Sequence, residues 1–118
     1  LRNNQIDISF EQIGKASDLE YINLDSTKIS SLAGIGQGRS LREIRIQNCD
    51  LEGAKLPDEL FDLYYLDNLY LTSSNIGGQL SSHIGRLVNL KEFECAENKL
   101  NGQIPSEIGN LGKLTTLV

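Results

Sequence analysis

The sequence predicts an α/β solenoid, with a parallel β-sheet on its concave face and 3₁₀ or irregular turns on its convex face. Three observations lead to this fold class. Short apolar segments recur along the chain, and their starts lie twenty-two to twenty-five residues apart, a period typical of stacked repeats. An isoleucine or leucine, usually followed by glycine, stands six residues ahead of each start. The 118 residues hold three Phe, four Tyr and no Trp, so a core has to be built from Leu and Ile.

The recurring segments are expected to form parallel strands. They start at Leu19, Leu41, Leu66, Leu90 and Leu114. Each of the first four has apolar residues at its first, fourth and sixth places, and this alternation puts the fourth and sixth side chains on one face. A single strand cannot bury that face, so the coils must stack ~4.8 Å apart around a shared core. We therefore predict that the sixth-place residues lie side by side: Leu24, Ile46, Leu71 and Cys95.

The turn after each strand is predicted to be held by the residue at the ninth place, because the bend leaves backbone groups without partners. The ninth-place residues are Asn4, Thr27, Cys49, Ser74 and Asn98. Asn has both a donor and an acceptor, so Asn98 should satisfy these groups more fully than Thr, Ser or Cys. Leu1 and Ile6 fit the sixth and eleventh places of the coil that contains Asn4.

The return segments are expected to form short 3₁₀ or irregular turns, because Gly and Pro lie too close together for long helices. Ile–Gly pairs mark four of them, at residues 13–14, 35–36, 84–85 and 108–109. The stretch GIGQGRS, Gly34 to Ser40, contains one of these pairs. A phosphate-binding loop should follow a strand and open a helix. This stretch runs directly into the strand segment LREIRI and has Arg39 where the third glycine is needed, so it is interpreted as part of the repeat.

The full pattern, L-x-x-L-x-L-x-x-N-x-L, resembles the leucine-rich repeat. The unit that begins at Leu90 also resembles the plant-type subfamily, with its tail L-x-G-x-I-P-x-x-I-G-x-L. The matching residues are Leu100, Gly102, Ile104, Pro105, Ile108, Gly109 and Leu111. The unit at Leu19 departs from this tail, with Ser31 at the glycine position. The resemblance implies a horseshoe-shaped solenoid, and a setting like the ectodomains of receptor-like kinases and receptor-like proteins or like secreted inhibitors of cell-wall enzymes.

One repeat array is expected over the whole chain. Its units are a partial repeat at 1–18, repeats that start at 19, 41, 66 and 90, and a truncated repeat at 114–118. Solenoid ends require polar caps over the core, and neither end of this sequence offers one. We therefore expect the chain to be a fragment of a longer array.

Several functions are disfavoured by the composition. The formal net charge of −5 argues against nucleic acid and anionic membranes as partners. No apolar run reaches the ~20 residues of a membrane span. We expect no enzyme, cofactor or metal site, because His83 has no second histidine or cysteine in register and no visible nucleophile. Cys49 and Cys95 lie two coils apart, too far for a disulfide, and are interpreted as buried thiols.

The candidate binding site is the set of outward-facing residues on the concave sheet: Tyr21, Asn23, Arg45, Gln47, Asn68, Tyr70, Thr72, Glu92 and Glu94. Tyr and Arg often dominate recognition surfaces, so Tyr21, Arg45 and Tyr70 are the expected contact cluster. The second-place row alternates in charge and is interpreted as structural, through cross-strand pairs that contribute about 0.2–1 kcal/mol each. It consists of Glu20, Arg42, Asp67 and Lys91.

The expected function is recognition of a protein or peptide ligand by the concave face, as part of a larger receptor-like or secreted protein. The alternative is a structural segment within a larger complex, with contacts on the convex side or the edges. The resemblance implies an extracellular or cell-surface location. The ten Asn residues include no N-x-Ser/Thr site, and unpaired cysteines fit a reducing compartment as well, so an intracellular location is the alternative.

Overall fold

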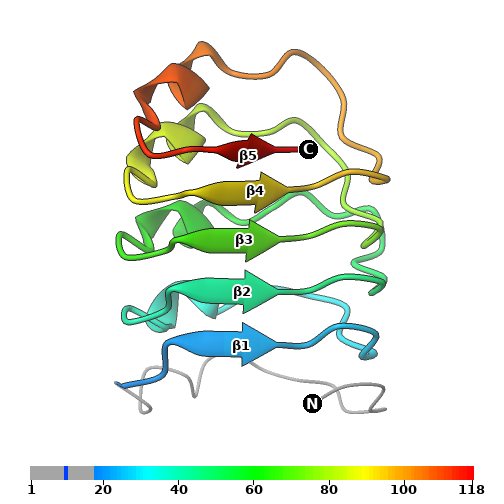
Figure 1. The fold of residues 1–118 in the computed structure, drawn as a ribbon. Helices are drawn as coiled ribbons and strands as arrows, with labels where there is room; N and C mark the ends of the chain where they lie inside the picture. Colours follow the sequence, from blue (N-terminus) through cyan, green and yellow to red (C-terminus); the bar gives the residue numbers. More distant parts are fainter. Residues whose placement is uncertain (1–9, 11–17) are drawn as a thin grey trace.

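The chain folds as a solenoid with one five-stranded parallel sheet, in which the strands follow one another in sequence order. The computed structural model describes Phe10 and residues 18–118. The strands are β1 (Tyr21–Asn23), β2 (Glu43–Arg45), β3 (Asn68–Tyr70), β4 (Glu92–Glu94) and β5 (Thr116–Leu117). The 3₁₀ helices between them are η2 (Ile35–Gln37), η3 (Asp58–Asp62), η4 (Ser82–Arg86) and η5 (Ser106–Asn110). Figure 1 shows the strands stacked on one side and the 3₁₀ helices on the other, which confirms the predicted fold class.

The sheet register follows the periodicity of the sequence. Ile22, Ile44, Leu69, Phe93 and Leu117 are aligned across the five strands. Beyond the strands, backbone bonds continue the ladder, from Leu24 N to Arg45 O at 2.7 Å and from Ile46 N to Tyr70 O at 2.8 Å. Leu24, Ile46 and Leu71 belong to one buried cluster, and Cys95 packs against it. The predicted alignment of the sixth-place residues is confirmed. The interpretations of Leu1, Asn4, Ile6 and the pair at 13–14 lie outside the described residues.

The glycines of the Ile–Gly pairs allow close contact between coils on the convex side. A Cβ built on Gly36 would lie 2.7 Å from the Cβ of Glu59, which belongs to the next coil. Gly36 N donates to Glu59 Oε1 at 2.8 Å, which further links the two coils. The GIGQGRS stretch forms η2 and the turn that leads to β2. This arrangement agrees with its interpretation as part of the repeat.

Three ninth-place residues, Asn98, Ser74 and Cys49, link their turn to the coil before it. Asn98 Nδ2 donates to the Leu71 carbonyl at 2.8 Å, and Asn98 Oδ1 accepts from Ser74 N at 2.9 Å and from Ile76 N at 3.1 Å. Ser74 Oγ donates to the Ile46 carbonyl. In the same way, Cys49 Sγ lies 3.2 Å from the Leu24 carbonyl. Asn98 also donates to two carbonyls of its own coil, so it satisfies more groups than Ser74 or Cys49, as predicted.

The cysteines, the alternating charge row and His83 lie only partly as the sequence predicts. Cys49 and Cys95 are free thiols, as expected, but Cys95 is only half-buried, whereas the sequence predicted two buried thiols. Of the alternating charge row, only Glu20 and Arg42 lie within ion-pair distance in the described part of the chain, at 3.6 Å. His83 is half-exposed on η4, and its Nδ1 lies 3.6 Å from Asp58 Oδ1 on η3, so it faces a carboxylate of the neighbouring coil.

Candidate ligand-binding face

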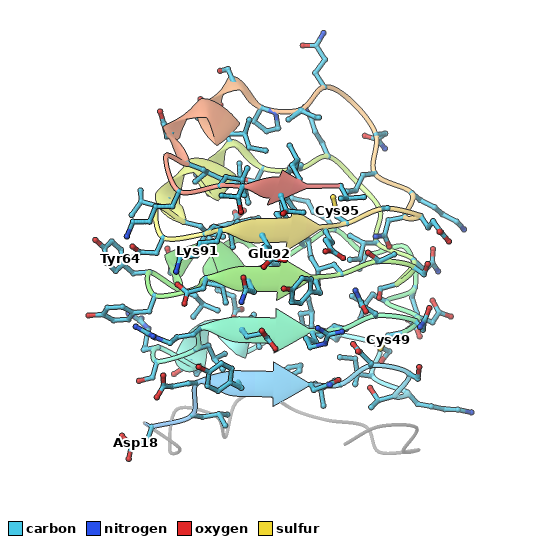
Figure 2. All side chains as sticks on the ribbon, in the orientation of Figure 1. Asp18, Cys49, Tyr64, Lys91, Glu92 and Cys95 are labelled. Carbon is cyan, nitrogen blue, oxygen red and sulfur yellow. The ribbon has the colours of Figure 1, made fainter. Side chains whose placement is uncertain are left out.

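The nine predicted site residues belong to one stretch of the sheet and its C-terminal edge. We call the sheet side that points away from the core the concave face. The middle residue of each strand packs into the core, so the flanking residues point the other way. Tyr21, Glu43, Asn68 and Glu92 are aligned in one row, and Asn23, Arg45, Tyr70 and Glu94 in the next. Gln47 and Thr72 follow β2 and β3. Figure 2 shows Glu92 projecting from this face at β4.

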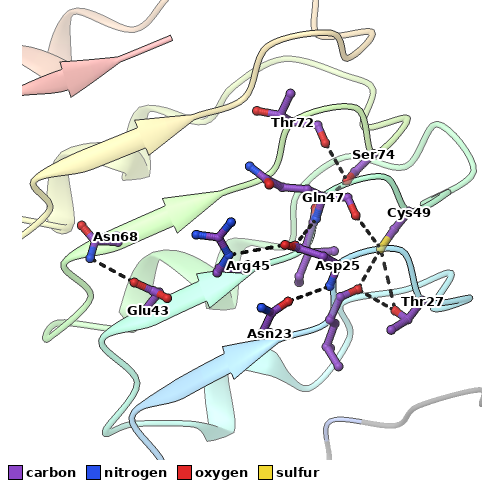
Figure 3. A network of polar contacts seen from close by, with 12 residues as sticks. Asn23, Asp25, Thr27, Glu43, Arg45, Gln47, Cys49, Asn68, Thr72 and Ser74 are labelled. Carbon is purple, nitrogen blue, oxygen red and sulfur yellow. Dashed lines mark hydrogen bonds and ion pairs between the residues drawn. The ribbon is translucent and has the colours of Figure 1, made fainter. Parts of the chain in front are cut away.

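Arg45 is held by two neighbours on the concave face. Its Nε lies 3.4 Å from Asp25 Oδ2, and its guanidinium carbon lies 4.7 Å from the centroid of the Tyr70 ring. Asp25 is buried, and its Oδ1 accepts from Gln47 N at 2.9 Å, while Asp25 N donates to Asn23 Oδ1 at 3.0 Å. Figure 3 shows this network across β1 and β2. The charge of Arg45 is therefore compensated within the protein.

Tyr70 is part of the sheet packing, and this corrects the expectation that it is an exposed contact residue. It is only 9% exposed, and its hydroxyl donates to Glu92 Oε1 at 3.1 Å. Burial, followed by this hydrogen bond and the nearby carboxylates, raises the pKa of Tyr70 to about 12. Tyr21 is 64% exposed at β1. The structure thus brings Arg45 and Tyr70 together, and of the three predicted contact residues Tyr21 is the aromatic side chain that is exposed.

Three glutamates surround Tyr70 and dominate the charge of the concave face. The negative charges of Glu92, Glu43 and Glu94 all act on the Tyr70 hydroxyl. Glu43 Oε1 accepts from Asn68 Nδ2 at 3.3 Å, and Glu92 accepts from Tyr70. Within Phe10 and residues 18–118, none of these three carboxylates forms an ion pair with Lys, Arg or His. The β2–β4 region of the face is therefore negatively charged.

Two features of the surface were missed by sequence reasoning. Asp25 is the buried partner of Arg45. The signal in the sequence was their opposite charge, with Asp25 at the seventh place of one unit and Arg45 at the fifth place of the next. Tyr64 and Tyr65 are 56% and 54% exposed and pack edge to face with centroids 5.4 Å apart. They lie just before β3, at the N-terminal ends of the strands, where Figure 2 labels Tyr64. Their signal was a Tyr–Tyr pair just ahead of a first-place leucine.

The described residues offer neither a metal site nor a membrane span. There, no group of three or more His, Cys, Asp or Glu side chains is placed to hold a metal ion. In the same part of the chain, none of the helices combines the length and apolar character needed to cross a bilayer.

The sequence and fold were compared with known proteins. The family model described as Leucine Rich Repeat matches residues 89–111. Receptor-like protein 41 of Arabidopsis thaliana is 30% identical over 115 residues, which cover 96% of this chain and 13% of that protein. The plant peptide hormone receptor RGFR1, solved in complex with RGF2, superposes with a TM-score of 0.84 at 29% identity, over 97% of this chain and 18% of that one.

A second solved structure extends the comparison. The Arabidopsis receptor kinase HAESA, in complex with the peptide hormone IDA and the co-receptor SERK1, has a TM-score of 0.84 at 26% identity. The match covers 96% of this chain and 19% of that one, so the chain spans less than a fifth of each of these relatives. The repeat pattern and the stacked parallel strands show a leucine-rich repeat solenoid, and its sequence is similar to the repeats of plant receptor-like proteins.

Proposed function

We propose that the chain is a non-enzymatic recognition module that binds a protein or peptide on its concave face, within a receptor-like or secreted protein at the cell surface. The observation that carries the proposal is the open sheet face itself. It presents the exposed Tyr21 and a row of polar side chains on a scaffold whose coils are hydrogen-bonded to one another. Rigid scaffolds with exposed aromatic side chains are well suited to recognition, because little side-chain freedom is lost on binding.

The comparisons support this proposal in general terms. RGFR1 and HAESA were both solved in complex with peptide hormones, and PEPR1 was solved as a PEPR1–AtPEP1 complex. The proposal that this chain also binds a peptide or protein extends the ligand binding of those proteins to this chain. Their receptor character also supports a cell-surface location over an intracellular one.

The test compares two exposed tyrosines. Random peptides displayed on phage are selected on the immobilised protein, and the selected peptides are then titrated against Tyr21→Ala and Tyr64→Ala. Both tyrosines are more than half exposed, so neither substitution should affect folding. We expect Tyr21→Ala to weaken binding at least about tenfold, as for an aromatic interface residue, and Tyr64→Ala to leave it unchanged. Peptides that bind equally well to Tyr21→Ala, Asn23→Ala and Thr72→Ala would argue against the concave face.

A second candidate function is a structural segment that contacts its partner through the edge of the solenoid formed by the N-terminal ends of the strands. The observation in its favour is the exposed Tyr64–Tyr65 pair, because exposed aromatic pairs are common at protein interfaces. The same titration distinguishes the two candidates. Binding that is lost in Tyr64→Ala and retained in Tyr21→Ala would favour the edge.

A further inference from the structure

We infer that the concave face selects an extended peptide segment that carries lysine or arginine side chains, and that Glu43, Glu92 and Glu94 are the groups that recognise them. This inference rests on the proposed function, since it names the chemistry of the ligand for the same face. It follows from how the charges of the face are distributed, from what neutralises each of them, and from the spacing of the carboxylates across the sheet.

The positive charge of the face is already compensated by a neighbouring carboxylate. Arg45 is the cation in the aligned rows of β1 to β4. Its Nε is directed at the buried Asp25 carboxylate, and its guanidinium lies against the Tyr70 ring. An anionic ligand would have to compete with a carboxylate that is already buried beside Arg45. The face is therefore not suited to bind an acidic segment.

The negative charge of the face remains uncompensated. Glu43 and Glu92 belong to one row, with Asn68 between them, and Glu94 is aligned with Tyr70 in the next row. Their carboxylates accept at most neutral hydrogen bonds, from Asn68 and from Tyr70. The Tyr70 hydroxyl thus orients Glu92 and leaves its charge in place. Each of the three carboxylates can still accept a charged hydrogen bond, which is stronger than a neutral one.

The spacing of the carboxylates favours a peptide over a small cation. Glu43 on β2 and Glu92 on β4 are separated by two strand spacings, or ~10 Å. The described residues hold no cluster of three carboxylates close enough for a metal ion. In an extended peptide, alternate side chains lie ~7 Å apart on one face, and Lys or Arg side chains are long and flexible enough to cover the difference. A segment that crosses the strands can therefore place two cationic side chains among the three glutamates.

The inference is tested with a variant that removes charge and keeps the hydrogen-bond acceptors. Glu43→Gln/Glu92→Gln/Glu94→Gln retains an acceptor for Asn68 and for Tyr70, and its folding is checked by circular dichroism. The matched control removes three charges elsewhere, at Glu52, Glu97 and Glu107, which are exposed off the concave face. Peptides from the phage selection described above serve as probes and are titrated by fluorescence anisotropy at low and high salt.

We expect the selected peptides to be enriched in Lys and Arg. We also expect the concave-face variant to bind them at least about tenfold more weakly, the control variant to bind normally, and the affinity of the original protein to fall at high salt, where charge attraction is screened. Peptides without such enrichment that still require Tyr21 would overturn the charge inference and leave the proposed function standing. Peptides that depend on neither Tyr21 nor the three glutamates would overturn both. Equally tight binding of spermine, a short polyamine, would overturn the peptide assignment.

Discussion

Arg45→Ala is expected to destabilise the protein by about 2–3 kcal/mol, because Arg45 compensates a buried carboxylate. The Asp25 side chain is 10% exposed and the Arg45 side chain 35% exposed, with 3.4 Å between Oδ2 and Nε. Removing one partner of a fully buried pair costs about 3–5 kcal/mol, and an exposed pair contributes less than about 1 kcal/mol. The partial exposure of Arg45 places its contribution between these limits, at about 2 kcal/mol. Loss of the contact with Tyr70 adds about 0.5–1 kcal/mol.

The measurement is urea unfolding followed by circular dichroism, within a double-mutant cycle. Asp25→Asn removes the negative charge and keeps an oxygen that accepts from Gln47 N. If Arg45 acts by compensating Asp25, Arg45→Ala should cost less stability in the Asp25→Asn background than in the original protein. Tyr21→Ala is the control and should change the free energy of unfolding by less than about 0.5 kcal/mol. An Arg45→Ala protein as stable as this control, or additive effects in the cycle, would refute the reasoning.

The outcome bears on how binding experiments are interpreted. Arg45 was an expected contact residue in the sequence, and a loss of binding in Arg45→Ala would then reflect altered packing of Asp25 and Tyr70. Tyr21 and Glu94 are better probes, because no side-chain hydrogen bond or ion pair ties either of them to the described chain.

Three further predictions concern the scaffold. Asn98→Ala should lower the free energy of unfolding by about 3 kcal/mol, since five hydrogen bonds at about 1 kcal/mol each are partly replaced by water. Ser74→Ala loses fewer bonds and should lower it by about 1–2 kcal/mol. Equal losses for the two variants in urea unfolding would contradict the larger role of Asn98. Gly36→Ala should be destabilising by about 1–3 kcal/mol, because its Cβ would lie 2.7 Å from that of Glu59. In the control Gly109→Ala, the added Cβ meets nothing within 4 Å, so the melting temperature should not change. Equal melting temperatures for the two variants would contradict the close packing at Gly36. In an absorbance titration, Tyr70 should ionise near its raised pKa of about 12, above the ordinary tyrosine value of 10.0. The stabilising contribution of the protonated Tyr70 hydroxyl is present below pH ~10 and is lost as the pH rises through the folded pKa. A single absorbance transition near the ordinary tyrosine pKa would contradict the burial of Tyr70.

The rows of the sheet could be predicted because strand side chains alternate with a period of two. A slip of one residue would turn every leucine of a strand outward, so the register of Ile44 against Leu69 follows from the sequence alone. The ninth-place bonds could be predicted for a similar reason, since the bend leaves backbone groups that only a polar side chain at that place can reach.

The environment of the site could not be predicted in the same way. Periodicity gives the row of a side chain and not the direction in which it leans across its neighbours. Tyr70 is buried because the Arg45 guanidinium lies against its ring and Glu92 accepts from its hydroxyl. Asp25 is buried because the turn after β1 directs it at Arg45 and Gln47. These contacts join residues that are twenty or more positions apart, so the sequence showed the face and not which of its residues pair.

The starts of successive coils differ in spacing by up to three residues, yet the sheet register is unbroken from β1 to β5. The differences in length are accommodated in the segments between the strands. Epitope tags or reporter peptides are therefore best inserted in the segments between the strands, away from the coil-to-coil bonds such as Gly53 N to Asn75 O. A single residue inserted after Tyr70 would instead misalign the ladder that joins Leu71 to the next coil.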